Sequence, residues 1–397
     1  MTYNTTRKCC YAGYFVQAVN INFLPLLFVI FQEQFKLSYA QIGTLVSLNF
    51  GVQIVVDILS VFIVDKVGFR ISAILSQLLS ASGLMLLPVL ASCMDAHFLG
   101  IVIATSLYSI GAGLIEIVNN PIIATLPKDE NESGNKLIIL HSFYCWGQLL
   151  TVLISTLALR IFGESSWGYI SVFWGLVPFI NGLFFFKTPI MPPQLTEKNK
   201  NVGVLLKNKT FIVILVLMIC AGGSELAMAQ WASAFAQKAL GVDKIVGDLL
   251  GPCLFALFMG IGRTVHGLYG EKLNFRLNMC INCVLCALCY AVAVFSKNAY
   301  VALAGCSLCG YAISIMWPGV VSLSADKVGG GSGSAYSVIA IFGDIGCSLA
   351  TFITGVIATM PIWGSNGLKA GLFVNIVFPI VFLFAFLKLT QKKRSIS

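Results

Sequence analysis

The sequence predicts an all-α integral membrane protein with twelve transmembrane helices in two six-helix, pseudo-symmetric halves. Three observations lead to this fold class. Hydrophobic residues make up 58% of the 397 residues and charged residues only 10%, whereas soluble domains carry roughly 25% charged residues. The apolar residues gather in runs long enough to cross a bilayer, which takes roughly 20 residues. A loop pattern also recurs at the same place in each half of the chain.

Twelve apolar runs are found with a window of about 19 residues. They cover residues 10–31, 40–64, 70–92, 98–126, 136–162, 167–187, 210–238, 246–270, 275–296, 299–323, 333–358 and 366–389. Runs of this length favour helices, because a spanning backbone must satisfy its own hydrogen bonds and barrel strands are shorter. One long polar segment, 188–209, separates the sixth run from the seventh. We therefore expect an N-terminal bundle at 1–190, a linker at 191–209 and a C-terminal bundle at 210–397.

Positive residues set the expected orientation. If the N terminus is cytoplasmic, eighteen of the 25 Lys and Arg residues fall on the cytoplasmic side and six on the outer side, with Arg263 inside a span. Both termini and the linker are therefore expected in the cytoplasm. The net charge of +9 follows from this bias, so it does not indicate binding to nucleic acid.

The second and eighth runs are followed by matching loops. Residues 61–70 read VFIVDKVGFR and residues 267–276 read GLYGEKLNFR. The two copies lie 206 positions apart, which fits parallel six-helix repeats related by an axis along the membrane normal. The spacing resembles the loop signature of the major facilitator superfamily, Gly-x-x-x-Asp-Arg/Lys-x-Gly-x-Arg/Lys. Val61 departs from it in the first copy, and Glu271 and Asn274 depart in the second.

These loops provide candidates for gating, namely Asp65, Lys66, Arg70, Glu271 and Arg276. A helix N terminus carries free N–H groups and roughly half a positive charge. We hypothesise that Asp65 docks on the glycine-rich start of the eleventh helix, near residues 329–335, when the cytoplasmic side is closed. By symmetry, Glu271 is expected to dock on the start of the fifth helix. The alternative is a solvated turn that only fixes the topology.

We single out seven ionisable residues inside predicted spans: Asp57, Glu116, His141, Glu225, Arg263, His266 and Asp344. An ionised carboxylate at mid-membrane costs roughly 2.5–3.5 kcal/mol on insertion scales, and such residues are functional by default. Glu116 lies near the middle of the fourth span, where the alternative is a structural carboxyl that is protonated or hydrogen-bonded. Glu225 and Asp344 lie at similar depth. We expect them to line one central cavity with Glu116, where solute sites of this architecture lie.

Asp57 and Arg263 occupy equivalent places in the repeat, each eight residues before the loop acid. Opposite charges in a low dielectric need partners. We expect Asp57 and Arg263 to pair with each other, or Arg263 to pair with a neighbouring helix. Either way, we expect a structural or gating role rather than contact with the solute.

A neutral, polyhydroxylated solute would suit such a cavity, because carboxylates and amides bind hydroxyl groups and aromatic faces stack on sugar C–H surfaces. The polar and aromatic candidates are Gln17, Asn20, Asn120, His141, Tyr144, Trp146, Gln148, Gln230, Trp231 and Trp317. Depth favours Asn20, Asn120, His141 and Trp231. For each candidate the alternative is an interhelical hydrogen bond or a membrane-interface aromatic.

Several helices resemble the fucose–galactose–glucose:proton symporter family. That family's fourth helix carries a Gly-x-x-Glu-x-x-x-Asn-Pro pattern, matched here by Gly113, Glu116, Asn120 and Pro121. Its first, seventh, tenth and eleventh helices are similar to residues 24–43, 223–231, 314–318 and 331–343. The resemblance implies the major facilitator fold and transport of a monosaccharide driven by protons, with Glu116 in coupling and sugar binding.

One departure bears on coupling. The L-fucose permease of that family has an aspartate in its first helix shortly before Leu-Pro, whereas residues 20–25 here read NINFLP. Glu116 is then the sole coupling carboxylate of the N-terminal half, or the protein is a uniporter, or it takes a different solute. We expect Glu116 to load a proton from the acidic outer side, the solute to bind the neutral site, and the halves to rock inward.

Other classes fit the sequence less well. An enzyme needs a catalytic cluster at one interface, whereas these acids lie at mid-depth in several helices. The sequence has no phosphate-binding Gly-x-x-x-x-Gly-Lys-Ser/Thr loop for ATP-driven transport. Four cysteines spaced by three (Cys280, Cys283, Cys286 and Cys289) drift around a helix instead of converging on a metal.

We therefore expect no cofactor, no metal and no nucleic acid. The expected partners are a small solute, protons and the lipid bilayer, for a monomer in the plasma membrane, taken as a bacterial inner membrane. The alternatives are a uniporter or exporter of another neutral or zwitterionic metabolite or drug, and a receptor that binds without transport.

Overall fold

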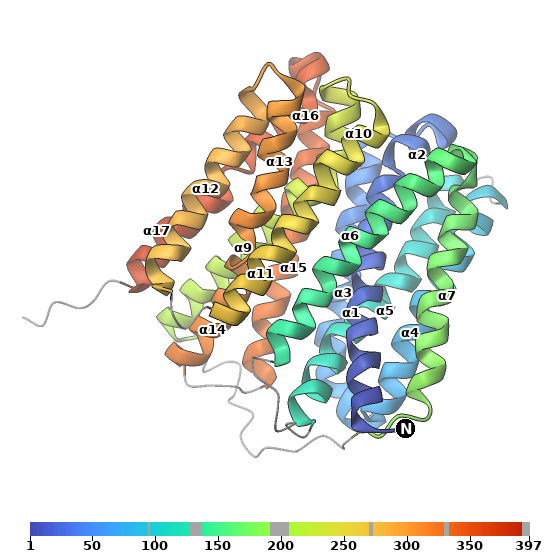
Figure 1. Cartoon of the computed structure of the whole chain (residues 1–397), viewed down its shortest axis with the longest axis vertical. Helices are drawn as coiled ribbons and strands as arrows, with labels where there is room; N and C mark the ends of the chain where they lie inside the picture. The colour runs from blue at the N-terminus through green and yellow to red at the C-terminus, as the bar shows by residue number, and fades with distance from the viewer. Residues whose placement is uncertain (94–95, 127–135, 191–205, 270–272, 329–332, 391–397) are drawn as a thin grey trace, which may run out of the picture.

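The computed structural model describes residues 1–93, 96–126, 136–190, 206–269, 273–328 and 333–390, and every regular element within them is a helix. The N-terminal half contains α1 (Tyr3–Leu26), α2 (Phe28–Phe35), α3 (Tyr39–Val67), α4 (Phe69–Cys93), α5 (His97–Thr125), α6 (Lys136–Phe162) and α7 (Trp167–Phe185). The C-terminal half contains α9 (Lys209–Ala234), α10 (Lys244–Asp248), α11 (Leu254–Tyr269), α12 (Phe275–Phe295), α13 (Ala299–Ile313), α14 (Met316–Val328), α15 (Gly333–Ala358), α16 (Gly367–Val374) and α17 (Val377–Thr390). Figure 1 shows the two groups side by side.

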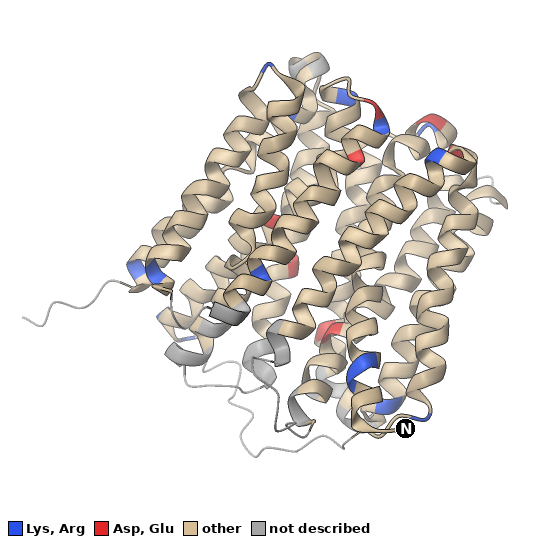
Figure 2. Ribbon diagram, viewed as in Figure 1, with Lys and Arg blue, Asp and Glu red and all other residues tan. Residues whose placement is uncertain are grey.

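The described helices account for all twelve predicted spans. Eleven are long and apolar enough to cross a membrane, and the bent pair of α1 and α2 makes up the twelfth. Figure 2 shows most charged residues near the two ends of the helices, with few in between. Large apolar side chains such as Phe173, Phe184 and Leu288 are exposed on the outer surface of the bundle. An apolar belt between charged ends is what a helical protein presents to lipid, so the predicted fold class is confirmed.

Several spans that the sequence shows as continuous contain a break or a distortion, and four of these lie at or near a proline. α1 bends by 47° into α2 at Leu27, two residues after Pro25. α10 passes into α11 through a π-helical turn that contains Pro252. Pro318 and Pro379 lie in the first turns of α14 and α17, just after breaks. Proline lacks an N–H group and is best accommodated at such positions. A hydropathy window misses the breaks because each piece is apolar.

The two halves meet chiefly along three helix pairs, α3 with α15, α6 with α11, and α1 with α9. Glycines allow the first pair to approach closely, since a Cβ on Gly43 would lie 3.4 Å from the Cα of Gly355. Nearby, the Ser47 hydroxyl donates to the Ser348 main-chain oxygen at 3.2 Å, and the Ser348 hydroxyl donates back at 3.3 Å. Small residues commonly permit this kind of packing between membrane helices.

The boundaries of the two bundles stay a prediction. Residues 191–205 of the expected linker lie outside the described residues. α9 begins at Lys209, the last residue assigned to the linker.

Candidate functional site: a cavity between the two halves

A cavity of about 60 Å³ lies between the halves, a volume that holds a few water molecules. Its wall comes from α1, α3, α5 and α6 on one side and α9, α11, α14 and α15 on the other. The lining residues are Tyr14, Gln17, Ile21, Phe50, Gln53, Glu116, His141, Tyr144, Glu225, Leu226, Arg263, Trp317, Asp344 and Cys347. Eight of them were named as candidates from the sequence: Gln17, Glu116, His141, Tyr144, Glu225, Arg263, Trp317 and Asp344. The structure brings these eight together from seven helices.

Glu116 reaches the cavity from α5. Gln17 of α1 donates from Nε2 to Glu116 Oε2 at 2.9 Å. Asn120, one turn further along α5, donates to the main-chain oxygen of Glu116 at 3.0 Å and accepts from the Tyr14 hydroxyl at 2.9 Å. Asn120 therefore holds Tyr14 at the wall without lining the cavity itself. The side-chain oxygen of Gln17 is buried with no hydrogen-bond partner among the described residues, which leaves an acceptor beside Glu116.

Arg263 forms an ion pair with Glu225. Its Nη2 atom donates to both carboxylate oxygens, at 3.3 and 3.1 Å, and each side chain is 7% exposed. Of the two arrangements expected for Arg263, the structure shows the pairing with a neighbouring helix, α9, and not the pairing with Asp57. A buried charge pair of this kind neutralises both groups locally.

Three further acids at or near the cavity have no cationic partner among the described residues: Asp57, Glu116 and Asp344. Asp57 is 2% exposed, and neither of its carboxyl oxygens has a hydrogen-bond partner there. Its neighbour Val56 packs against α5, with its Cβ 3.1 Å from a Cβ built on Gly113. Asp57 thus lies next to the segment of α5 that carries Glu116.

Aromatic side chains complete the wall. A Cβ on Gly343 would clash with the Trp317 indole ring, so this glycine lets the ring lie against α15 beside Asp344. Tyr14 and His141 meet edge to face, with ring centroids 4.9 Å apart and an interplanar angle of 72°. Indole and phenol rings are the groups expected to contact the apolar surface of a sugar.

Two other predicted solute contacts lie away from the wall, in interhelical hydrogen bonds. Asn20 donates to the Ser80 hydroxyl of α4 at 2.9 Å. Trp231 donates from its indole nitrogen to the main-chain oxygen of Thr351 at 3.1 Å and packs against Phe28. Both residues therefore make interhelical hydrogen bonds, which is the alternative to solute contact that the sequence left open.

The gating candidates are only partly described. Arg70 donates to the main-chain oxygens of Phe185 and Phe186, at 3.1 and 2.9 Å, and so caps the end of α7. Arg276 is exposed at the start of α12. The side chains of Asp65 and Lys66, and the whole of Glu271, lie outside the described residues. Their docking on helix N termini stays a prediction.

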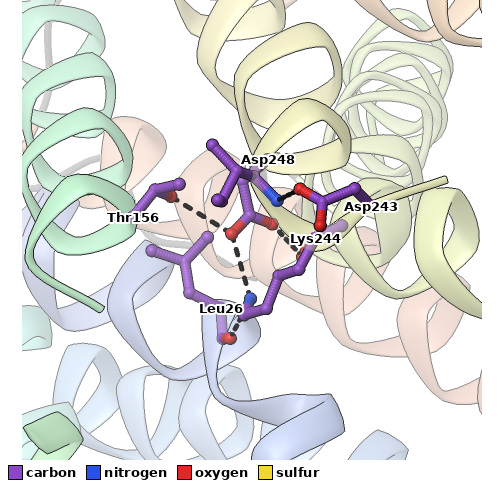
Figure 3. A network of polar contacts seen from close by, with 7 residues as sticks. Leu26, Thr156, Asp243, Lys244 and Asp248 are labelled. Carbon is purple, nitrogen blue, oxygen red and sulfur yellow. Dashed lines mark hydrogen bonds and ion pairs between the residues drawn. The ribbon is translucent and has the colours of Figure 1, made fainter. Parts of the chain in front are cut away.

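A polar network joins the halves (Figure 3), around α10 at the end of the molecule opposite the N terminus (Figure 1). Asp248 of α10 accepts hydrogen bonds from Lys244 Nζ at 2.9 Å, from the Thr156 hydroxyl of α6 at 3.1 Å, and from the Ser233 hydroxyl. Lys244 also donates to the main-chain oxygen of Leu26 at 2.9 Å. The side chains of Lys244 and Asp248 are 10% and 1% exposed. This buried pair therefore fastens α10 to both α6 and α1.

The break in the first span supplies acceptors for contacts between the halves. Because Pro25 has no N–H group, the Ile21 carbonyl four residues earlier lacks its helical donor, and it accepts from Gln230 of α9 at 3.1 Å. The Leu26 carbonyl lies at the end of α1 and accepts from Lys244. The structure thus places Gln230, a predicted solute contact, between the halves and outside the cavity wall.

Sequence reasoning missed part of the wall and the whole Asp248 network. The wall residues that it did not name are Tyr14, Ile21, Phe50, Gln53, Leu226 and Cys347. Most of these are ordinary core types in apolar runs, which carry no signal of their own. Asp248 did carry a signal in the sequence, because it is an acid inside the predicted span 246–270, close to the start of that span.

Comparison with known proteins identifies the family. The family model of the Major Facilitator Superfamily matches residues 10–351. The chain belongs to the Major Facilitator Superfamily. Among curated proteins, no match to this sequence is found. The superfamily assignment confirms the predicted architecture and makes the chain a membrane transporter.

Solved structures of three transporters share this fold over nearly the whole chain. A D-xylose–proton symporter has a TM-score of 0.79 and 13% identity, covering 98% of each chain. The E. coli fucose:proton symporter has a TM-score of 0.68 and 16% identity, covering 99% of this chain and 100% of its own. The nucleoside transporter NupG has a TM-score of 0.73 and 15% identity, covering 97% of this chain and 100% of its own. Identities this low establish the fold and leave the solute to be argued from the cavity.

Proposed function

We propose that this superfamily member is a secondary active transporter that moves a monosaccharide together with protons by alternating access. The observation that carries the proposal is the cavity, in which the Glu116 carboxyl, hydrogen-bonded to Gln17, faces hydrogen-bonding and aromatic groups of both halves. Solute sites of this architecture lie between the repeats at mid-membrane. Two of the compared structures are symporters of D-xylose and of fucose with protons, which supports a sugar.

Glu116 is the proposed coupling group. Its carboxyl is within reach of solute in the cavity, and the protonation state of this carboxyl determines how it hydrogen-bonds to Gln17. With a proton bound, the Glu116 side chain carries no charge, and the wall offers acceptors and donors to hydroxyl groups. His141, Tyr144 and Trp317 are the proposed solute contacts on the same wall, with Glu225 held in place by Arg263. Rocking of the halves then exposes the loaded site to the other side, where the proton leaves.

The solute is tested first by thermal unfolding of the purified protein. The panel contains L-fucose, D-xylose, D-galactose, D-glucose and uridine, each at two pH values. Because a ligand that binds the folded state raises its stability, we expect at least one sugar to raise the unfolding temperature, and more strongly at the lower pH. Stabilisation by uridine alone would favour a nucleoside as solute, and a response independent of pH would favour uniport.

Coupling is tested with Glu116→Gln in proteoliposomes, using a solute that the panel identifies. We expect the variant to keep counterflow exchange but to lose accumulation driven by a pH gradient, because the amide cannot carry a proton. Glu164→Gln is the matched control, since Glu164 is exposed in the short helix before α7. Uphill uptake by the Glu116 variant at the wild-type level would contradict the proposal.

We also propose that both termini face the cytoplasm of a bacterial cell and that the protein acts as a monomer. The threefold excess of positive residues on one side supports this orientation. Cys93 provides a test, because it is exposed at the end of α4, on the face opposite the N terminus. A membrane-impermeant maleimide added to intact cells should label Cys93, and Cys93→Ser should abolish the signal. Labelling only after the cells are broken would reverse the orientation.

A further inference from the structure

We infer that Asp344 is a second proton-binding carboxyl of this transporter and that it forms, with Glu116 and Asp57, one cluster shared between the two halves. The inference deepens the proposed function and rests on its proton coupling. Asp57 and Glu116 belong to α3 and α5 of the N-terminal half, whereas Asp344 belongs to α15 of the C-terminal half. The sequence alone pointed to Asp344 as a solute contact and to Asp57 as a gating residue.

The geometry places these acids together. Asp344 and Glu116 line the same cavity from opposite halves. Asp57 lies beside Val56, which packs on Gly113 one turn before Glu116. Two carboxylates that share a site cannot both ionise freely.

No cation among the described residues neutralises this cluster. Arg263, the basic residue in the cavity wall, is already paired with Glu225. Both carboxyl oxygens of Asp57 and the side-chain oxygen of Gln17 are buried without hydrogen-bond partners in the described part of the chain. Burying an ionised carboxylate without a partner is costly. A bound proton removes the charge, and it adds an O–H donor near these acceptors.

The cluster must be distinguished from the other titratable groups that face the cavity. These are Tyr14, His141, Tyr144, Glu225, Arg263 and Cys347. Glu225 and Arg263 neutralise each other, and the two phenols are hydrogen-bonded to Asn120 and Asn22. His141 and Cys347 remain, and neither an imidazole nor a thiol absorbs in the infrared band of a protonated carboxyl.

The position of Asp344 explains how protonation and conformation can be linked. Each carboxyl takes one proton from water to form an O–H bond and later returns it to water, and no other bond changes. Rocking alters the separation between α15 and the α3–α5 pair, and with it the repulsion between Asp344 and the other two acids. The number of protons held by the cluster therefore depends on which face is open. This supplies a second carrier in a chain whose first helix has Asn20 and Asn22 instead of an acid.

The test is infrared difference spectroscopy of the purified full-length protein in lipid, titrated with acid in the absence of any solute. Wild type, Glu116→Gln, Asp344→Asn and the double variant are compared, with Glu164→Gln as the control. We expect the band of protonated carboxyl groups to lose amplitude in each single variant and to lose more in the double variant. The remaining group should also titrate at lower pH in each single variant, because one source of repulsion is gone.

A titration of Asp344→Asn that superimposes on wild type would overturn the inference. So would a band that responds to Na⁺ at fixed pH, since the cluster would then be a metal-cation site. If Asp344→Asn does not fold, Asp344→Glu is used instead, and a shifted but retained band is expected. The experiment contains no sugar, so its result does not depend on whether the protein transports a sugar. If Asp344→Asn does not change the titration, proton coupling through Glu116 remains possible.

Discussion

The network around Asp248 and the cluster around Glu116 are both buried between the halves, yet their charges are satisfied very differently. Asp248 accepts hydrogen bonds from an ammonium group and two hydroxyls. Asp57 in the cluster has no partner among the described residues. A satisfied buried charge mainly holds elements in place, whereas an unsatisfied one is available to a proton or a solute. The comparison therefore distinguishes the Asp248 network, which holds helices of the two halves together, from the Glu116 cluster, which can bind a proton or a solute.

The hydrogen bonds from the C-terminal half to α1 also lie at one face of the molecule. Lys244 and Gln230 of the C-terminal half bind main-chain carbonyls of α1, on the side away from the N terminus. With the proposed orientation this is the outer face, and these contacts hold the two halves together there. Opening to that face must break these contacts, whereas the cavity acids are not part of them.

The largest effect is expected for Asp248→Asn. The substitution leaves the Lys244 ammonium buried without its counter-charge, and breaking a buried pair in this way costs roughly 3–5 kcal/mol. The closed form should therefore lose population to a form open at this face. Spin labels at Tyr169 of α7 and Tyr300 of α13, both exposed, report the separation of the halves. The spin-labelled proteins also carry Cys93→Ser and Cys280→Ser, because these two native cysteines are not fully buried and could react with the label.

Two companion variants make this result specific. Lys244→Met combined with Asp248→Asn removes the unpaired charge, so the double variant should be more closed than the single one. Glu33→Gln breaks the exposed pair with Lys238 on the same face, where the side chains are 59% and 33% exposed. Such pairs contribute about 0.2–1 kcal/mol, so the distance should hardly change. Equal opening in Glu33→Gln and Asp248→Asn would remove the distinction between the two pairs.

A smaller effect is expected for Glu225→Gln. Arg263 then loses its counter-charge, but it lines the cavity, where water can solvate it. A loss of roughly 1.5–3 kcal/mol in unfolding free energy is expected, the range for hydrogen bonds to charged groups. Denaturant unfolding in detergent measures it, and Glu225→Gln with Arg263→Gln should recover part of the loss. No loss in the single variant would mean that the pair contributes nothing to the fold.

The sequence predicted the spans well because a bilayer imposes length and hydropathy on every one of them. It also singled out Glu116, Glu225 and Asp344, because a charge inside an apolar run is visible without any structure. It could not show that Arg263 pairs with Glu225 of its own half instead of Asp57 of the other half, since tertiary packing decides which helices are neighbours. Nor could it show the break at Leu27, which depends on backbone bonding around Pro25 and not on hydropathy.

The smallest effect is expected for Asp57→Asn, which applies the substitution used at Asp248 to the other kind of site. The amide is close in size to a protonated carboxyl, and the described part of the chain makes no hydrogen bond to the Asp57 carboxyl that could be lost. The unfolding free energy at neutral pH should therefore change by less than about 1 kcal/mol, and the spin-label distance should stay as in wild type. The variant should still alter the acid titration of Glu116 and Asp344, since one repelling group is gone. Destabilisation as large as that of Asp248→Asn would mean that Asp57 is a structural charge, and the contrast between the two regions would fail.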